Sequence, residues 1–362
     1  MSAARTDYAG EKAVQIREAT QKIIGTLPND VFDYILALSE STQPMTRYAY
    51  ATDLKLFINY LQRENPKFSK DLIAWTSKDF ENVSVKDINM YLDYLTVYFN
   101  DNDVMVTNQE LGKQRKFYSI RSFYKWLYKQ QKIKSDVTAL VDSPKRHEKP
   151  IIRLDQNEVN KMLTLAETGE KLTAVQQKYH ELTMLRDKAM LSLFLGTGIR
   201  VSECVGMNID DINLDEACFL VTRKGGNQVI LYLPDEIIPA LKDYIEQRKH
   251  TEALPGHENA LFLSLQKRRI TVRAVENMVK KYAKIAAPLK NRISPHKLRS
   301  TFGTNLYNET GDIYLVADVL GHSDINTTRR HYAAMNDERR RFAATKVKLT
   351  NEDSENTTEE KE

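Results

Sequence analysis

Apolar residues recur at helical spacing along most of this chain, and this periodicity restricts the fold more than any other feature. The first such run covers 46–64, and its apolar face is made of Tyr50, Leu54, Phe57, Ile58 and Leu61. A second run, 84–99, starts with Ser84 and Asp87 at the spacing of an N-terminal capping box. A third, 108–130, places its apolar residues on one side: Phe117, Ile120, Tyr124 and Leu127. These runs predict a helical bundle in the first part of the chain.

One stretch breaks this pattern. Residues 217–223 and 228–233 are rich in apolar and β-branched side chains and flank Lys224-Gly225-Gly226-Asn227, which predicts a β-hairpin. Helical patterns surround it, at 154–167, 182–195, 235–248, 271–286, 295–308 and 312–320. The expected fold class is therefore mainly α, with a small β-sheet in the C-terminal domain.

The segment 143–150 holds two prolines and dense charge, which is typical of a linker. The predicted organisation is an N-terminal extension at 1–40, a helical domain at 41–135, a linker at 136–152, a second domain at 153–349 and an acidic, disordered tail at 350–362.

The net charge of +4 hides a more basic body. Residues 351–362 carry six acids and one lysine, a net charge of −5, so residues 1–350 carry +9. Part of this excess lies on one side of the run 108–130, in Lys113, Arg115, Lys116, Arg121 and Lys125. Such a face is either an ordinary solvated surface or, because few acids pair with its lysines, a set of contacts for DNA phosphates.

The two cysteines, Cys204 and Cys218, have neither metal-ligand spacing nor a secretory context, so both are expected to be reduced thiols. Every apolar run is shorter than the ~20 residues of a membrane span. The start, MSAARTDYAGEK, lacks the apolar core of a signal peptide. These features predict a cytoplasmic protein without a membrane segment.

The motif GTGIRVSE, 196–203, contains two glycines but no third glycine and no Lys-Ser/Thr pair, which argues against a nucleotide loop. The glycines are expected to end one helix and start another. This would place Arg200 in a first helical turn, with Glu203 three residues on to orient it. Taken alone, an Arg–Glu pair of this kind is usually structural.

The motif SPHKLRST, 294–301, predicts a helix that starts at Pro295 with Ser294 as its cap. His296 and Arg299 then lie on one face of the first turns, where a helix already favours anions. The alternative is a histidine and an arginine that only pack there. Lys224, at the tip of the hairpin, is either a solvated turn residue or a side chain that reaches DNA.

The segment LGHSDINTTRRHYAAMN, 320–336, begins with a helix end at Gly321. His322 and His331 do not have the spacing of a known zinc site, and no acids or cysteines complete a ligand set, so no metal is expected. Tyr332 directly follows the cationic residues of this segment.

The order of these residues resembles the signature of the tyrosine recombinase family, the integrases and Xer-type recombinases. In chain order they are Arg200, Lys224, His296, Arg299, His322 and Tyr332, and the resemblance covers about residues 45–345. It implies a two-domain clamp on double-stranded DNA that carries a specific recombination site. The clamp would consist of a helical N-terminal domain that binds DNA and a catalytic domain.

The resemblance also implies the role of each residue, and no cofactor. Tyr332 would be the nucleophile that forms a 3′-phosphotyrosyl link, and Arg200 and Arg299 would bind the scissile phosphate. His296 would assist proton transfer at the tyrosine. Lys224 would protonate the leaving 5′-oxygen, and His322 would donate a hydrogen bond to a phosphate oxygen.

Tyr332 is chosen because it follows His322 by ten positions, whereas Tyr307 and Tyr314 lie in apolar helices and are expected in the core. Xer recombinases usually carry the tyrosine one position earlier, where this chain has His331. The longer spacing is similar to that of integrases of phages and transposons.

The run 337–349 predicts a last helix with Phe342, Ala343 and Val347. In this family such a helix docks into a neighbouring subunit of a homotetramer on two DNA sites; alternatively it packs on its own domain. We favour Xer-like resolution of chromosome or plasmid dimers, with a DNA translocase or accessory factor as a further partner, because few residues precede Thr46. The alternatives are an integrase of a mobile element, a type IB topoisomerase, and a non-catalytic DNA-binding protein.

Overall fold

The computed structural model describes residues 8–100, 102–144, 152–223, 226–290 and 292–322, together with 325 and 328. The chain divides into two compact units, Met1–Lys149 and Pro150–Glu362. Each unit has a hydrophobic core of its own.

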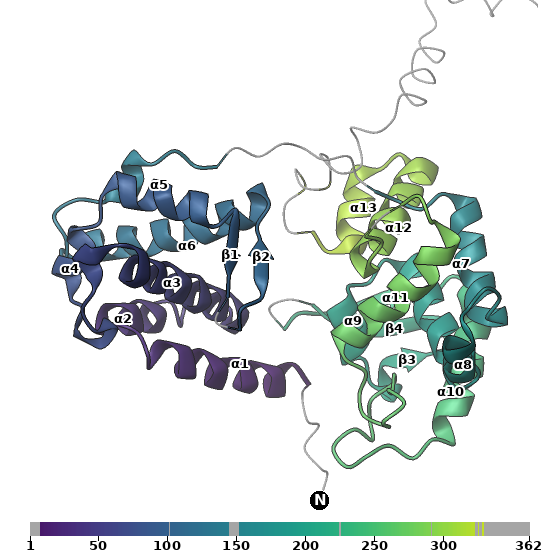
Figure 1. The fold of residues 1–362 in the computed structure, drawn as a ribbon. Helices are drawn as coiled ribbons and strands as arrows, with labels where there is room; N and C mark the ends of the chain where they lie inside the picture. The colour runs from purple at the N-terminus through teal and green to yellow at the C-terminus, as the bar shows by residue number, and fades with distance from the viewer. Residues whose placement is uncertain are drawn as a thin grey trace, which may run out of the picture. The chain divides into compact units, whose positions relative to one another are not determined.

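The N-terminal unit is a helical bundle with one small hairpin (Figure 1). Its helices are α1 (Tyr8–Ile24), α2 (Asn29–Ala37), α3 (Pro44–Glu64), α4 (Ser77–Glu81), α5 (Val85–Tyr94) and α6 (Glu110–Lys129). The apolar faces expected on α3 and α6 are buried: Leu54, Phe57, Phe117 and Tyr124 are all fully enclosed. The Ser84 capping box is also confirmed, because Asp87 Oδ2 accepts the Ser84 N–H at 2.8 Å.

Two features of this unit differ from the sequence-based expectations. The run 84–99 is helical only to Tyr94, and its end forms strand β1 (Val97–Phe99), which pairs with β2 (Met105–Thr107). β-branched and aromatic residues there favour a strand once a partner is available. Helices α1 and α2, within the predicted extension 1–40, pack against α3, and Val31 and Tyr34 of α2 are buried in the common core.

In the described residues the C-terminal unit contains seven α-helices, two short 3-10 helices and one antiparallel sheet. The helices are α7 (Gln156–Thr168), α8 (Ala174–Thr197), α9 (Val201–Gly206), α10 (Ile238–Lys249), α11 (Val272–Ala286), α12 (Pro295–Thr310) and α13 (Ile313–Leu320). The sheet order is β3 (Ile212–Asn213), β4 (Cys218–Thr222), β5 (Gln228–Tyr232). The β4–β5 register pairs Thr222 with Gln228, which confirms the predicted hairpin.

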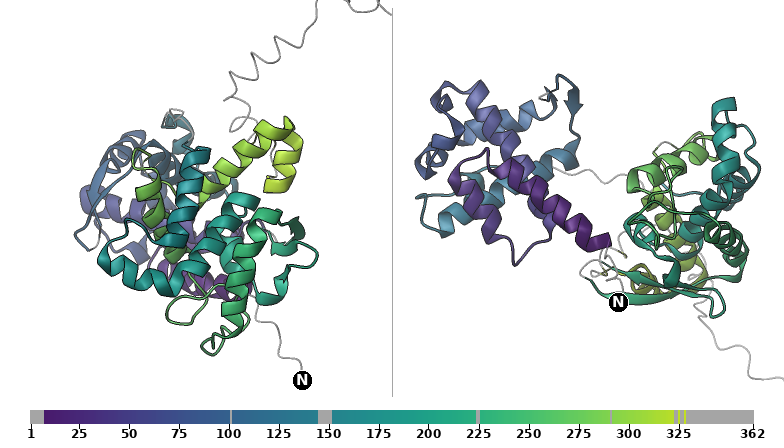
Figure 2. Two further views of the ribbon diagram at one scale, coloured as in Figure 1. Left: turned by 90° about the vertical axis from the view of Figure 1, so that its right-hand side faces the viewer. Right: turned by 90° about the horizontal axis from the view of Figure 1, so that it is seen from below.

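Helix α8 packs against α7, α10 and α12. Helix α13 lies beside α12, and the two form the yellow-green end of the described chain in Figure 2. Met190, Leu191, Leu193 and Phe194 are fully buried on different sides of α8, as expected if the C-terminal half of this helix is covered all round. The C-terminal ends of α8 and α13 therefore have fixed positions in the fold.

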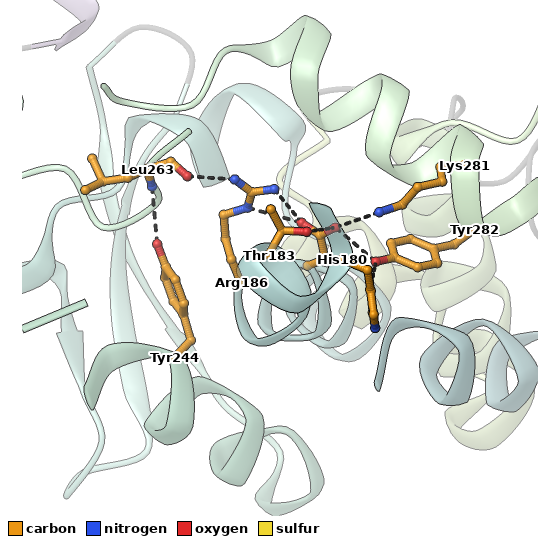
Figure 3. A network of polar contacts seen from close by, with 8 residues as sticks. His180, Thr183, Arg186, Tyr244, Leu263, Lys281 and Tyr282 are labelled. Carbon is orange, nitrogen blue, oxygen red and sulfur yellow. Dashed lines mark hydrogen bonds and ion pairs between the residues drawn. The ribbon is translucent and has the colours of Figure 1, made fainter. Parts of the chain in front are cut away.

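A buried polar network joins α8 to α11 (Figure 3). Asp187, which is 1% exposed, accepts hydrogen bonds from Arg186 Nη2 at 2.7 Å, Lys281 Nζ at 3.1 Å and Tyr282 Oη at 3.0 Å. Arg186 Nη1 also donates to the Leu263 carbonyl at 2.9 Å. Burial opposes ionisation of Asp187, but Arg186 and Lys281 outweigh it and hold the pKa of its carboxyl below the usual range.

We expect Asp187→Asn to destabilise the α8–α11 pair by about 3 kcal/mol at neutral pH, because two largely buried cations lose their counter-charge. Hydrogen exchange in α8 and α11 should then become about 10²-fold faster. The lowered pKa means that this stabilisation is complete above the ordinary carboxyl pKa of ~4 and is lost as the pH falls through the folded value. Variant and wild type should therefore converge in acid.

The matched control is Asp243→Asn, at an exposed aspartate on α10. It should leave exchange unchanged across the same pH range. Equal protection of α8 and α11 in Asp187→Asn and wild type at neutral pH would contradict the role given to Asp187.

Candidate active site

Three arginines from distant parts of the C-terminal unit meet at the end of α13. Backbone carbonyls at a helix C-terminus have no partner within the helix and carry partial negative charge. Here the four carbonyls of residues 318–321 each accept a hydrogen bond from a guanidinium group, donated by Arg223, Arg299 or Arg200. We call residues 317–322 the α13 terminus.

Arg200 stands at the start of α9. Glu203, three residues on, accepts the Arg200 backbone N–H at 2.8 Å and its Nη1 at 2.7 Å, as the sequence predicted. Arg200 Nη2 donates to the Gly321 carbonyl at 2.8 Å. A guanidinium has five N–H donors, so Arg200 keeps donors for a further anion beyond these contacts.

Arg299, on α12, links the ends of two helices. Its side chain is 4% exposed, and Nη1 donates to the Gly198 carbonyl at 2.6 Å while Nη2 donates to the Leu320 carbonyl. Gly198 ends α8 in the left-handed conformation at φ 64°, where a Cβ would lie 2.9 Å from Leu320 Cδ2. Glycine is thus required where α8, α12 and α13 approach one another.

His296 lies in the first turn of α12 and is exposed, in contrast to buried Arg299. The helix begins at Pro295 as expected, although the Ser294 hydroxyl makes no capping hydrogen bond. The His296 carbonyl accepts a hydrogen bond from Ser300 Oγ at 3.0 Å. The histidine therefore stands at the start of the helix, at the surface of this unit.

His322 follows Gly321, which ends α13 in the left-handed conformation at φ 61°. Its N–H donates to the Ala317 carbonyl at 2.9 Å, and the Gly321 N–H donates to the Asp318 carbonyl at 2.8 Å, which is the paired bonding of a Schellman motif. The ring Nδ1 lies 2.8 Å from the hydroxyl oxygen of Thr328, a fully buried residue. This contact sets the orientation of the half-buried imidazole ring.

The structure thus brings together Arg200, Arg299 and His322. Lys224, His331 and Tyr332 lie outside the described residues, as does the predicted helix at 337–349. Sequence reasoning missed Arg223, for which the only signal was its place beside Lys224. It also misplaced Tyr314, which is 72% exposed and not in the core. Tyr314 occupies the first turn of α13, at the other end of the helix from the arginines.

The basic residues of α6 lie in the N-terminal unit and have varied surroundings. Arg115 forms a two-pronged ion pair with buried Asp53, and Arg121 donates to the carbonyls of residues 138 and 141. Lys113 donates to Thr96 and Lys116 to Asn108, while Lys125 is exposed. The two arginines therefore help to hold the bundle, in addition to any contact with DNA.

In the described part of the chain, no three His, Cys, Asp or Glu residues are grouped so that they could hold a metal ion. Cys204 is buried, which raises the pKa of its thiol, and Cys218 is half-buried; neither forms a disulfide. None of the helices described is both long and apolar enough to span a membrane.

Residues 152–339 match the sequence model of the phage integrase family. A tyrosine recombinase XerC of Caldanaerobacter subterraneus subsp. tengcongensis is 34% identical over 322 residues, which are 86% of this chain and 84% of the relative. A tyrosine recombinase XerD of Shewanella oneidensis is 28% identical over 302 residues, or 83% of this chain and 89% of the relative.

Solved structures share the fold at low identity. XerH site-specific recombinase in a post-cleavage complex with palindromic difH substrate superposes with a TM-score of 0.62 at 18% identity, covering 95% of this chain and 98% of that one. A lambda integrase dimer bound to a COC′ core site gives 0.57 at 16% identity, covering 84% and 76%. From the family match and the XerC relative, the chain belongs to the phage integrase family and is a tyrosine recombinase, an enzyme that cleaves and rejoins DNA.

Proposed function

We propose that this recombinase resolves chromosome or plasmid dimers by cutting double-stranded DNA at a specific site, with Tyr332 as its nucleophile. The observation that carries the catalytic part is the convergence of Arg200, Arg299 and His322 on the α13 terminus. The similarity to XerC and XerD recombinases supports the cellular role.

Cleavage begins when Tyr332 Oη attacks the scissile phosphorus and the bond to the 5′-oxygen breaks. Negative charge spreads over the non-bridging oxygens as the reaction proceeds, and Arg200 and Arg299 stabilise it through guanidinium donors. His322 donates a hydrogen bond to one of the same oxygens. The rigid seating of both arginines on backbone carbonyls means that little reorganisation is needed at the moment of reaction.

Two proton transfers accompany this step. A phenol has a pKa of ~10, so Tyr332 is protonated at neutral pH and must lose its proton as it attacks. His296, exposed at the start of α12, assists that loss, and Lys224 supplies a proton to the leaving 5′-oxygen. The product is a 3′-phosphotyrosyl link and a free 5′-hydroxyl.

The reaction needs no external energy source. The phosphotyrosyl bond replaces the phosphodiester bond, so the 5′-hydroxyl of a second strand can attack it and release Tyr332. Two rounds of this exchange recombine the four strands of two duplexes. A homotetramer bound to two sites supplies one nucleophile for each strand. The run 337–349 docks on a neighbouring subunit in this assembly, and a DNA translocase or accessory factor controls it in the cytoplasm.

The basic side of α6 contacts the DNA backbone. Lys113, Arg115, Lys116, Arg121 and Lys125 lie along one helix, and cations of this kind bind phosphates independently of base sequence. Arg115 is paired with a buried carboxylate and Arg121 binds two carbonyls, whereas Lys113 and Lys116 each donate to one neutral side chain and Lys125 is exposed. The lysines therefore supply most of this contact.

Tyr332→Phe should abolish covalent attachment to a nicked suicide substrate while DNA binding stays within about twofold, because only the attacking hydroxyl is removed. Denaturing gels measure the adduct and fluorescence anisotropy measures binding. Tyr314→Phe is the control: it alters an exposed tyrosine of α13 and should form the adduct at the wild-type rate. An adduct in Tyr332→Phe would remove this tyrosine from its role.

Arg200→Lys should lower the single-turnover cleavage rate by about 10²- to 10³-fold, since a lysine cannot reproduce the planar donors of a guanidinium. Arg273→Lys, at an exposed arginine of α11 that pairs with Glu276, should have no effect. Thermal unfolding of both variants shows whether the fold is kept. Cleavage by folded Arg200→Lys within a few-fold of wild type would contradict a role at the phosphate.

A second candidate is an integrase of a mobile element, favoured by the ten-residue spacing from His322 to Tyr332. Mapping the chromosomal sites occupied by Tyr332→Phe distinguishes the two. We expect one occupied site for each replicon; occupancy confined to the ends of a mobile element would favour the integrase.

A further inference from the structure

Arg223 shares the α13 terminus with the two arginines of the proposed active site. It directly follows strand β4, and its backbone closes the hairpin: its N–H donates to the Asn227 carbonyl at 2.8 Å. Its guanidinium group reaches α13, where Nη1 donates to the Asp318 carbonyl at 3.2 Å and Nη2 to the Val319 carbonyl at 2.8 Å. One side chain therefore joins segments that are 95 residues apart in the sequence.

The carbonyls that Arg223 binds belong to the turn that carries His322. Asp318 O accepts both the Gly321 N–H and Arg223 Nη1, so the arginine reinforces the same Schellman turn. The guanidinium group lies close against Gly321, where a side chain would collide with it: a Cβ on Gly321 would lie 2.8 Å from Arg223 Nε. Any movement of Arg223 therefore changes the support of the backbone immediately before His322.

Each of the three arginines binds different carbonyls of the α13 terminus. Arg299 and Arg200 bind those of residues 320 and 321, nearest to His322, and Arg223 binds those of residues 318 and 319, one step further into the helix. Cations at a helix C-terminus are stabilising because they oppose the helix dipole. Three positive groups around one terminus also repel one another, so their separation depends on these fixed carbonyl positions.

We propose that Arg223 is a positioning residue that sets the place of His322 against the scissile phosphate. It acts through the α13 terminus, because both hydrogen bonds that its guanidinium group makes to described residues are to backbone carbonyls there. This inference rests on the proposed role of His322 as a donor to a non-bridging phosphate oxygen. It adds a residue whose effect on catalysis passes through protein backbone and not through DNA.

A double-mutant cycle tests the proposal with the full-length protein and a nicked suicide substrate. His322→Ala should lower the single-turnover cleavage rate by about 10²-fold, as for the loss of one donor to a developing charge. Arg223→Ala should lower it by about 10-fold through misplacement of that donor. If Arg223 acts through His322, the double variant should lose about 10²-fold, whereas independent effects would give about 10³-fold.

DNA affinity separates positioning from direct contact. Arg223→Ala should bind the substrate as wild type does, with the same dependence on salt, because its guanidinium group binds protein carbonyls. Weaker binding with a smaller salt slope would mean that Arg223 contacts a phosphate, and would overturn the proposal. Arg273→Ala is the matched control and should leave both rate and affinity unchanged.

The outcomes also separate this inference from the proposed function. Wild-type cleavage by His322→Ala would refute the assigned role of His322 itself. Two results would refute only the positioning role, provided that His322→Ala loses about 10²-fold in cleavage rate as expected. One is a double variant whose loss is the product of the two single losses, and the other is an Arg223→Ala variant that cleaves at the wild-type rate. If Arg223→Ala is too unstable to assay, Arg223→Gln, whose amide can donate to one carbonyl, takes its place in the same cycle.

Discussion

The C-terminal end of α13 is the constraint on which the C-terminal unit depends. Its last carbonyls cannot be satisfied within the helix, and three guanidinium groups bind them. Arg299 is the most enclosed of these and also binds the end of α8, so two helix termini share one buried cation. The cost of burying this charge is offset by hydrogen bonds to oriented carbonyl dipoles.

This arrangement shows how the proposed phosphate site can be ordered before DNA binds. Side chains that bind a substrate lose conformational entropy when they are ordered. Here the arginines are already ordered in the folded protein, so this entropy is lost during folding and not during DNA binding. Glu203 and the carbonyls of Gly198 and Gly321 hold Arg200 and Arg299 in place. The network around Asp187, earlier in α8, stabilises the same helix from α11.

The N-terminal unit is held together by aromatic packing and one ion pair between helices. Its core is rich in aromatic rings, several of which pack edge to face, such as Phe80 against Phe123 at 5.0 Å between centroids. The ion pair of Arg115 with Asp53 fixes α6 on α3. A charge pattern that the sequence left open as either a solvated surface or a DNA-binding face therefore also has a part in holding the bundle.

Periodicity and turn residues in the sequence were enough to predict the helical faces of α3 and α6, the β4–β5 hairpin and the ends of α8 and α13, because each depends on neighbouring residues. The order of the motifs was enough to predict the family. Strand β1 and the packing of α1 and α2 were not predictable, because both depend on partners elsewhere in the chain. The exposure of Tyr314 was missed because a residue in an apolar helix can still lie on its outer face.

By itself the sequence determined which residue types the site contains and the local elements that carry them. Only the tertiary structure decided that Arg200, Arg223 and Arg299 meet at one helix terminus. Their partners are backbone carbonyls, which every residue possesses and which leave no mark in the sequence. Arg200 and Gly321 are 121 positions apart, and only the packing of α12 against both α8 and α13 brings such groups within hydrogen-bonding distance.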